Sequence, residues 1–319
     1  MLEHFIFSAN AVFPIFLVIA IGYFLRQKRF LSVSTIGEMN RLVFTFALPI
    51  LLFRNIYEAD FTALIDTGFI LWILGSTIIA FVLLWIFAEC YLRKQKALIG
   101  AFVQAGWRSN YAIVGLPLVA NIMEGQDVGI GAFAAAFVVT TYNVFSVVVL
   151  TAKDSQNVTL NAALVKHMII GVCKNPSIIG IACGVLFNLL NIPLPFIVSA
   201  SVNYMAILCA PMALLAVGGS IQVSELVGYL KPALTCSIIK IIVTPLIFMP
   251  ISIWLGFRGE ALAVLLVMFA NPTAIVSYVM AARMNGNTAI TSAIILITTV
   301  SSSITLTIGV YLLRAFALV

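Results

Sequence analysis

The sequence contains little charge. Only 9% of its 319 residues are charged, whereas 63% are hydrophobic and the mean hydropathy is +1.16. Soluble domains carry roughly 25% charged residues, so a water-soluble fold is excluded. Runs of about 20 apolar residues recur along the chain, and this is the length that a helix needs to cross a bilayer. The sequence predicts an all-α polytopic membrane protein.

Several chemical signatures are absent from the sequence. The five cysteines form no CxxC pair, so we interpret them as small core residues. His4 and His167 lie outside the centres of the apolar runs, which argues against an intramembrane enzyme built on histidine. No nucleotide-binding motif is present, so ATP does not drive the protein directly. We expect no enzymatic activity, no cofactor and no metal, and the net charge of +6 does not indicate nucleic acid.

The apolar runs predict ten transmembrane spans. They cover residues 8–25, 36–54, 68–91, 98–122, 128–151, 175–191, 195–221, 232–255, 260–282 and 287–313. The loops on one side carry most of the basic residues, namely Arg26, Lys28, Arg29, Arg93, Lys94, Lys96, Lys153, Lys166, Lys174, Lys231 and Arg283. Because basic loops stay in the cytoplasm, both termini should lie outside a cytoplasmic cell membrane.

An internal repeat relates the two halves of the chain at a constant offset of 162 residues. The matched positions are Pro14 with Pro176, Pro49 with Pro211, and 112–114 with 274–276. We therefore divide the chain into a first five-helix repeat (1–152), a cytoplasmic linker (153–174) and a second five-helix repeat (175–319). Since five is an odd number of spans, the second repeat should be inverted in the bilayer, as in many secondary transporters.

Corresponding spans of the two repeats carry residues that break helices. The fourth span contains Asn110, Gly115 and Pro117, and the ninth contains Asn271 followed by Pro272. Irregular backbone at membrane depth is tolerated where protein or a water-filled cavity surrounds it. The free N–H groups at two half-helix starts would attract an anion there. The alternative is a pair of simple kinks in packed helices.

At these residues the chain resembles the auxin efflux carrier family, which includes bacterial permeases for organic acids such as malonate or malate. The resemblance rests on "NYAIVGLPL", "KIIVTP" and "NPTAIVSYVMA", and it extends over nearly the whole chain. It implies a fold like that of the bile acid symporters, in which broken helices 4 and 9 cross. It also implies a scaffold of spans 1, 2, 6 and 7 and a transport core of spans 3–5 and 8–10. The substrate-binding residues suggested by the breaks and the resemblance together are Asn110, Tyr111, Gly115, Pro117, Asn271, Pro272 and Thr273.

Ionisable and polar side chains inside the spans complete the candidate site. Arg108 and Lys240 lie deep in spans 4 and 8, and no Asp or Glu lies deep in any span. Intramembrane charges are functional by default. Arg108 either binds a substrate carboxylate or reaches the cytoplasmic vestibule. Lys240 either takes the place of a bound cation or only packs between helices, and Tyr142 and Asn143 either line a cavity or bond another helix.

These features predict a transporter of small organic anions, either mono- or dicarboxylates. It would work by secondary active or facilitative transport, through an elevator-type displacement of the core. The alternative is a cation–proton antiporter of similar fold, against which the missing midplane carboxylate argues. The partners would be the anion and the lipid bilayer, and a homodimer is left open. Substrate identity, coupling ion and direction are not determined by the sequence.

Overall fold

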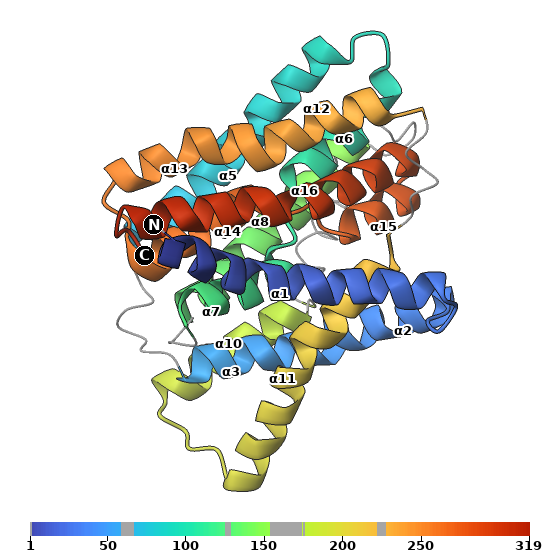
Figure 1. Ribbon diagram of the computed structural model, residues 1–319. Helices are drawn as coiled ribbons and strands as arrows, with labels where there is room; N and C mark the ends of the chain where they lie inside the picture. Colours follow the sequence, from blue (N-terminus) through green and yellow to red (C-terminus); the bar gives the residue numbers. More distant parts are fainter. Residues whose placement is uncertain (1, 59–66, 125–128, 154–173, 175, 222–227) are drawn as a thin grey trace.

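The computed structural model describes residues 2–58, 67–124, 129–153, 174, 176–221 and 228–319 (Figure 1). Within these ranges the regular structure is helical, apart from one isolated β-bridge. Of the predicted linker 153–174, residues 154–173 lie outside the described residues. An all-helical membrane protein is therefore confirmed, whereas the count of ten spans and the inverted orientation of the repeats stay predictions.

Seven helices in the described part of the chain are long and apolar enough to cross a membrane. They are α1 (Leu2–Gln27), α2 through α3 (Val33–Glu58), α5 (Thr67–Tyr91), α8 (Gly129–Lys153), α11 (Phe196–Gly219), α12 through α13 (Leu230–Trp254) and α16 (Thr288–Ala315). Three shorter apolar helical segments are Tyr111–Ile122, which includes α7 (Leu116–Ile122), α10 (Pro176–Leu189) and α14 (Gly259–Ala270). The remaining half-helices are α6 (Ile99–Trp107) and α15 (Val276–Arg283).

Three helices contain a short π-helical segment. These segments are Val43–Ala47 between α2 and α3, Tyr111–Gly115 before α7, and Ile239–Val243 between α12 and α13. A π-bulge inserts a residue into the helical ladder and is frequent at functional sites. The third segment carries Lys240 and the second begins directly after Asn110.

The helices divide into two groups in space (Figure 1). The helices α1, α2, α3, α10 and α11 lie in the lower part of the view, and α5, α6, α8 and α12 to α16 lie above them. The helix α1 packs on both α11 and α16 and so joins the two groups. The helix α7 lies below α1 in this view, beside the lower group. The division into a scaffold and a core that the resemblance implies, and their relative motion, stay predictions.

Close glycine contacts hold the lower group together. Gly22 of α1 leaves no room for a Cβ against the backbone of Leu215 in α11, and Gly184 of α10 is similarly close to Phe53 in α3. Gly22 and Gly184 are 162 residues apart in the sequence, and so are Phe53 and Leu215. The same offset that relates the sequence halves thus relates two packing contacts, since small residues let membrane helices approach closely.

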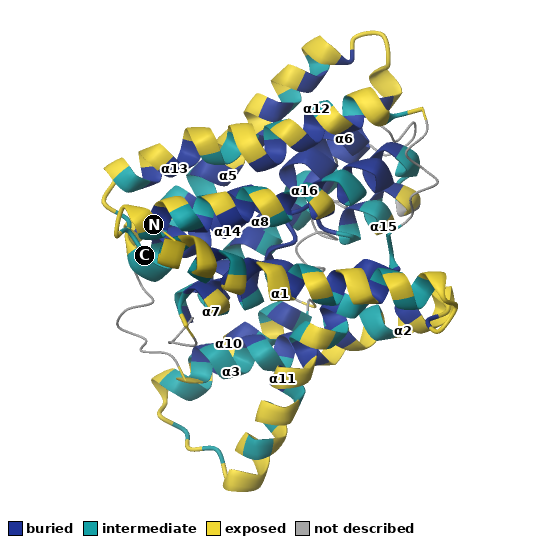
Figure 2. Cartoon of the chain, in the orientation of Figure 1, coloured by how far each residue is buried: buried dark blue, intermediate teal, exposed yellow. Residues whose placement is uncertain are grey.

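Burial separates a lipid-facing surface from a central pair of half-helices (Figure 2). Every residue of α6 is buried, and so is α14 from Leu262 to Ala270. Large apolar side chains such as Leu17, Leu246 and Trp254 are exposed instead, which suits contact with hydrocarbon. The two predicted break regions therefore lie at the centre of the molecule.

The two termini lie at the same end of the helix bundle (Figure 1). The guanidinium of Arg314 lies over the ring of Phe7, 3.7 Å from its centroid, and also forms an ion pair with Glu124. At the opposite end of α5 and α8, Glu89 forms an ion pair with Lys153. A chain with an even number of spans has both of its termini on the same side of the membrane, and the termini here lie at the same end.

Candidate functional site at the helix crossover

The two central helices break where the sequence predicts. After α6 the chain is extended at Arg108, with φ −73° and ψ 113°, and helical structure resumes at Tyr111. After α14 the chain is extended at Asn271, with φ −70° and ψ 152°. The residue before a proline is pushed out of the α region, so Pro272 accounts for the second break.

The two extended segments cross and bond to each other. Ser109 and Thr273 form an isolated antiparallel β-bridge. Beside it, the backbone N–H of Asn110 donates to the carbonyl of Pro272 at 2.8 Å. Backbone groups at a helix break have lost their helical partners. Each segment therefore supplies part of what the other lacks, in the middle of the protein.

Further bonds fix the crossover to the surrounding helices. The N–H of Ala274 donates to the carbonyl of Arg108 at 3.2 Å. The hydroxyl of Thr273 donates to the carbonyl of Ala105 at 2.7 Å, and its N–H donates to the hydroxyl of Thr298 in α16 at 3.1 Å. The N–H groups of Asn110, Thr273 and Ala274, which lie just before the starts of the two half-helices, are thus bonded within the protein.

Asn271 acts as a brace at the crossover. It is completely buried, and its Nδ2 donates to the carbonyl of Asn110 at 2.9 Å, whereas its Oδ1 has no hydrogen-bond partner among the described residues. A Cβ on Gly115 would lie 3.2 Å from this Nδ2 and 2.9 Å from Cγ1 of Val267. Gly115 therefore lets the two broken helices approach each other.

A cavity of about 390 Å³ lies beside the crossover, between the two groups of helices. Of the predicted site residues it is lined by Arg108, Asn110, Tyr111, Tyr142 and Asn143. Gly115, Pro117, Asn271, Pro272 and Thr273 are not part of its lining. The opposite wall comes from the segments Phe44–Leu52 and Pro176–Ile181, and Lys174 lies at its edge.

Arg108 is the buried charge of this cavity. Its side chain is 5% exposed, Nη2 donates to Oδ1 of Asn143 at 2.8 Å, and Nη1 lies 3.0 Å from Sδ of Met280. No ion pair found among the described residues includes Arg108, and none of the described residues lining the cavity is acidic. Arg108 thus lines the cavity next to the crossover, and both sequence interpretations of its role stay predictions.

Two half-helices start at the same cavity. Ala112 and Ile113 belong to the first turn after Asn110, and Val276 begins α15. The first N–H groups of a helix have no partner within that helix and carry its positive dipole end. An arginine and two such helix ends therefore lie at one cavity, and groups of this kind attract anions in proteins.

The two tyrosines have different surroundings. The hydroxyl of Tyr111 donates to the carbonyl of Gly131 at 2.8 Å, so this residue ties the half-helix to α8. The ring of Tyr142 packs edge-on against Trp107, with centroids 4.7 Å apart, and lines cavities on both of its sides. Tyr142 thus forms a wall between the crossover cavity and a second cavity of about 430 Å³, and Trp107 packs against it on the side of the second cavity.

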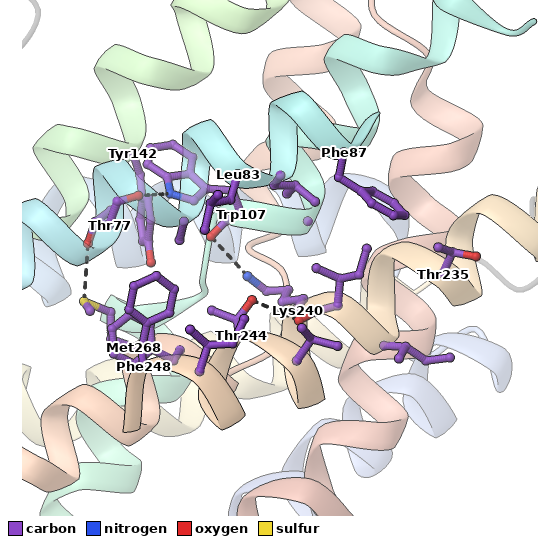
Figure 3. Close-up of a pocket in the computed structure, with 18 residues that line it drawn as sticks. Thr77, Leu83, Phe87, Trp107, Tyr142, Thr235, Lys240, Thr244, Phe248 and Met268 are labelled. Atoms are coloured by element: carbon purple, nitrogen blue, oxygen red, sulfur yellow. Dashed lines mark hydrogen bonds between the residues drawn. The ribbon is translucent and has the colours of Figure 1, made fainter. Parts of the chain in front are cut away.

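Lys240 lies on the far side of this wall (Figure 3). Its side chain is 2% exposed, and Nζ donates to the carbonyl of Trp107, the last residue of α6, at 3.3 Å. This carbonyl has no partner within α6, because the last four C=O groups of a helix accept no intrahelical hydrogen bond. A backbone carbonyl as partner fits both sequence interpretations of Lys240, substitution for a cation and packing between helices, and both stay predictions.

Sequence reasoning missed several partners of the site. Thr298 lies in a polar run of an otherwise apolar span, "ITTVSSSITLT", which was a usable signal. The sequence analysis treated Lys174 only as one of the basic loop residues and did not predict that it lines the cavity. Nothing local in the sequence indicates that Met280 lies against Arg108, because the two are 172 residues apart.

The broken helices, the membrane-spanning helices around them and the central cavity lined by a buried arginine are typical of a helical membrane transporter. The profile of the membrane transport protein family matches residues 7–310, and the chain belongs to this family. The resemblance to the auxin efflux carriers is thereby confirmed.

Two curated relatives are similar to nearly the whole chain. The chain is 22% identical over 302 residues to an "Uncharacterized transporter" of Methanothermobacter thermautotrophicus, covering 94% of this chain and 96% of that protein. It is 25% identical over 321 residues to a "Putative malonate transporter" of Rhizobium meliloti, covering 96% of each. The family and both names indicate a membrane transporter rather than an enzyme.

Proposed function

We propose that this protein carries small organic anions across the cytoplasmic membrane and binds them in the crossover cavity. The observation that carries the proposal is Arg108, a buried guanidinium that lines the cavity and has no carboxylate partner among the described residues. An uncompensated buried charge costs several kcal/mol, on the order of 2.5–3.5 on insertion scales. A substrate carboxylate would be its counter-ion, and a guanidinium suits a carboxylate because it can donate two parallel hydrogen bonds.

A dicarboxylate fits the charges around this cavity better than a monocarboxylate. Lys174 lies at the edge of the cavity, so that a second cation is available to a second carboxylate. The relative from Rhizobium meliloti is named for malonate, which is a short dicarboxylate. The runner-up function, a cation–proton antiporter, would need an acidic side chain at the midplane, and none of the described lining residues is acidic.

The position of the cavity supports an elevator-type mechanism. One wall is formed by the proposed core, including Arg108 and Asn143, and the other by apolar residues of the proposed scaffold, including Leu48, Leu52 and Ile181. A substrate that is held mainly by polar groups on one body and faces largely apolar surface on the other can travel with the first body, once its second carboxylate leaves Lys174, which precedes α10 of the proposed scaffold. We place the basic end of the bundle in the cytoplasm and both termini outside.

The test measures binding of malonate to purified protein by calorimetry. Replacing Asn143 by Asp gives Arg108 a built-in counter-ion at the position of Oδ1, which lies 2.8 Å from Nη2, with almost no change of volume. We expect this variant to lose malonate binding. Arg108→Met should lower the affinity on the order of 10–150-fold, the value of one charged hydrogen bond. Malonamide, the uncharged analogue, should not bind measurably.

The control is Arg54→Met, which removes an arginine that pairs with Glu58 away from the cavity. It should bind malonate as the wild type does. If the Asn143→Asp variant is folded and binds malonate with unchanged affinity, Arg108 is not the anion site and the proposal fails. Thermal unfolding of each variant shows whether the fold is retained.

A further inference from the structure

The helices α5 and α12–α13 run side by side in opposite directions and are joined near both ends. Near one end, Nε1 of Trp72 donates to the hydroxyl of Ser252 at 2.8 Å. Near the other, the hydroxyls of Tyr91 and Thr235 are 3.0 Å apart. The two contacts are 19 residues apart along α5, about 28 Å at the helical rise. They therefore enclose most of the hydrocarbon thickness between them.

The second cavity lies between these two contacts, and we call it the lateral slot. It has a volume of about 430 Å³ and lies between α5, the end of α6 and the α12–α13 helix (Figure 3). Its lining is mostly apolar, and Leu83, Ile238 and Ile247 at its sides are 50%, 50% and 44% exposed. Exposed apolar side chains on a membrane-spanning helix face lipid, so the slot opens toward the bilayer and not toward water.

Lys240 supplies a cation to this apolar slot. It lies near the middle of Leu230–Trp254, and thus near the bilayer centre. Its ammonium has three donors, and the one acceptor recorded for them in the described structure is the carbonyl of Trp107. None of the ion pairs among the described residues includes Lys240. The neighbouring hydroxyl of Thr244 donates to the carbonyl of Ile239 at 2.9 Å, which leaves that oxygen able to accept.

We propose that the lateral slot binds a single-chain carboxylic amphiphile, a fatty acid, which enters from the bilayer. The acyl chain would lie along Leu83, Phe87 and Ile247, and the carboxylate would bind the Lys240 ammonium. A phospholipid suits the slot less well because its headgroup stays at the membrane surface, whereas Lys240 is at mid-depth. A short dicarboxylate has no apolar part to fill the slot.

A fatty acid bound in the lateral slot would affect the crossover through the hydrogen bond between Lys240 and the carbonyl of Trp107. The carboxylate would compete with the Trp107 carbonyl for Lys240, and Trp107 directly precedes Arg108. Loss of this contact frees the end of α6 beside the anion cavity. This consequence, inhibition of anion transport, rests on the proposed function, whereas binding of the fatty acid does not.

The experiment uses the full chain in nanodiscs of phosphatidylcholine and a twelve-carbon fatty acid with a terminal diazirine. After illumination, labelled peptides are identified by mass spectrometry. We expect labels within 67–91 and 230–254, and we expect laurate to displace them at concentrations at least tenfold lower than dodecanol does. Equal displacement by the acid and the alcohol would mean a groove for lipid tails without recognition of the carboxylate, which contradicts the proposal.

Matched variants test the role of Lys240. Lys240→Met should weaken displacement by laurate about tenfold or more, Lys240→Arg should retain it, and Val243→Trp should fill the slot and remove the labels. Lys231→Met, an exposed lysine of the same helix, is the control and should behave as the wild type. If Lys240→Met does not fold, the Val243→Trp variant still tests whether the fatty acid binds in the lateral slot. Labelling that persists in folded Val243→Trp overturns the proposal. Since malonate affinity is measured separately, failure of either proposal leaves the other testable.

Discussion

At the scale of single residues, the crossover is stabilised by side chains that donate hydrogen bonds to backbone carbonyls. Asn271 uses Nδ2 to hold the carbonyl of Asn110, and Thr273 uses its hydroxyl to hold that of Ala105. The sequence analysis suggested both residues as substrate ligands; their geometry gives each a bracing contact, and a role toward a ligand stays a prediction. Arg108 differs from them because it faces a cavity.

We expect Asn271→Ala to destabilise the protein more than it weakens anion binding. The substitution removes one buried hydrogen bond to the carbonyl of Asn110, which keeps the N–H groups of Val114 and Gly115 as donors; such a bond contributes about 0.5–1.5 kcal/mol. The melting temperature of the purified protein should fall, while the malonate affinity of the folded fraction should change less than in Arg108→Met. An unchanged melting temperature combined with a large loss of affinity would instead identify Asn271 as a direct ligand.

At the scale of elements, the two broken helices depend on close approach. Gly115 lies in the π-helical start of the Tyr111–Ile122 segment and contacts α14 at Val267. Its position beside the Asn271 amide links the spacing of these helices to the bonds of the crossover. A larger side chain at Gly115 would push the Tyr111–Ile122 segment away from α14, and the hydrogen bonds of the crossover require these two helices to be in contact.

Gly115→Ala should therefore lower thermal stability. The added Cβ would lie 2.9 Å from Cγ1 of Val267, and overpacking of this kind costs about 1–3 kcal/mol. The control is Gly75→Ala in α5, where a Cβ would meet nothing within 4 Å. Because alanine favours a helix by up to about 1 kcal/mol over glycine, the control should be neutral or stabilised. Equal melting temperatures for the two variants would refute the packing argument.

At the scale of the whole molecule, the orientation in the membrane follows from charge. Arg93 and Lys94 follow α5 at one end of the bundle, and the chain termini lie at the other end. From the positive-inside rule we propose that the first end lies in the cytoplasm. The homodimer considered from the sequence stays a prediction at this scale, since a single chain is described.

Cysteine labelling checks the orientation. In a variant without the five native cysteines, Phe316→Cys should react with a membrane-impermeant maleimide on intact cells, because Phe316 is 71% exposed and lies at the end that we propose to face outside. Lys94→Cys, at the basic end, should react only after the cells are permeabilised. Reaction of Lys94→Cys on intact cells would reverse the proposed topology.

The sequence by itself determined the features that depend on local pattern. Apolar runs predict membrane helices because hydrocarbon requires them, and Pro272 predicts a break because its ring excludes the helical conformation before it. The depth of Arg108 and Lys240 in their spans was equally evident, since depth follows from position along a run. These properties belong to one segment at a time.

Only the tertiary structure decided which polar groups satisfy each other. Asn143 holds Arg108 from 35 residues away, Lys240 holds Trp107 from 133 residues away, and Trp72 reaches Ser252 across 180 residues. Such contacts depend on how helices pack, which local hydropathy does not encode. Asn271 and Arg108 looked alike in the sequence, as polar residues at a break. The fold turned the first toward the backbone and the second toward a cavity, because a buried polar group takes whatever partner the packing brings within reach.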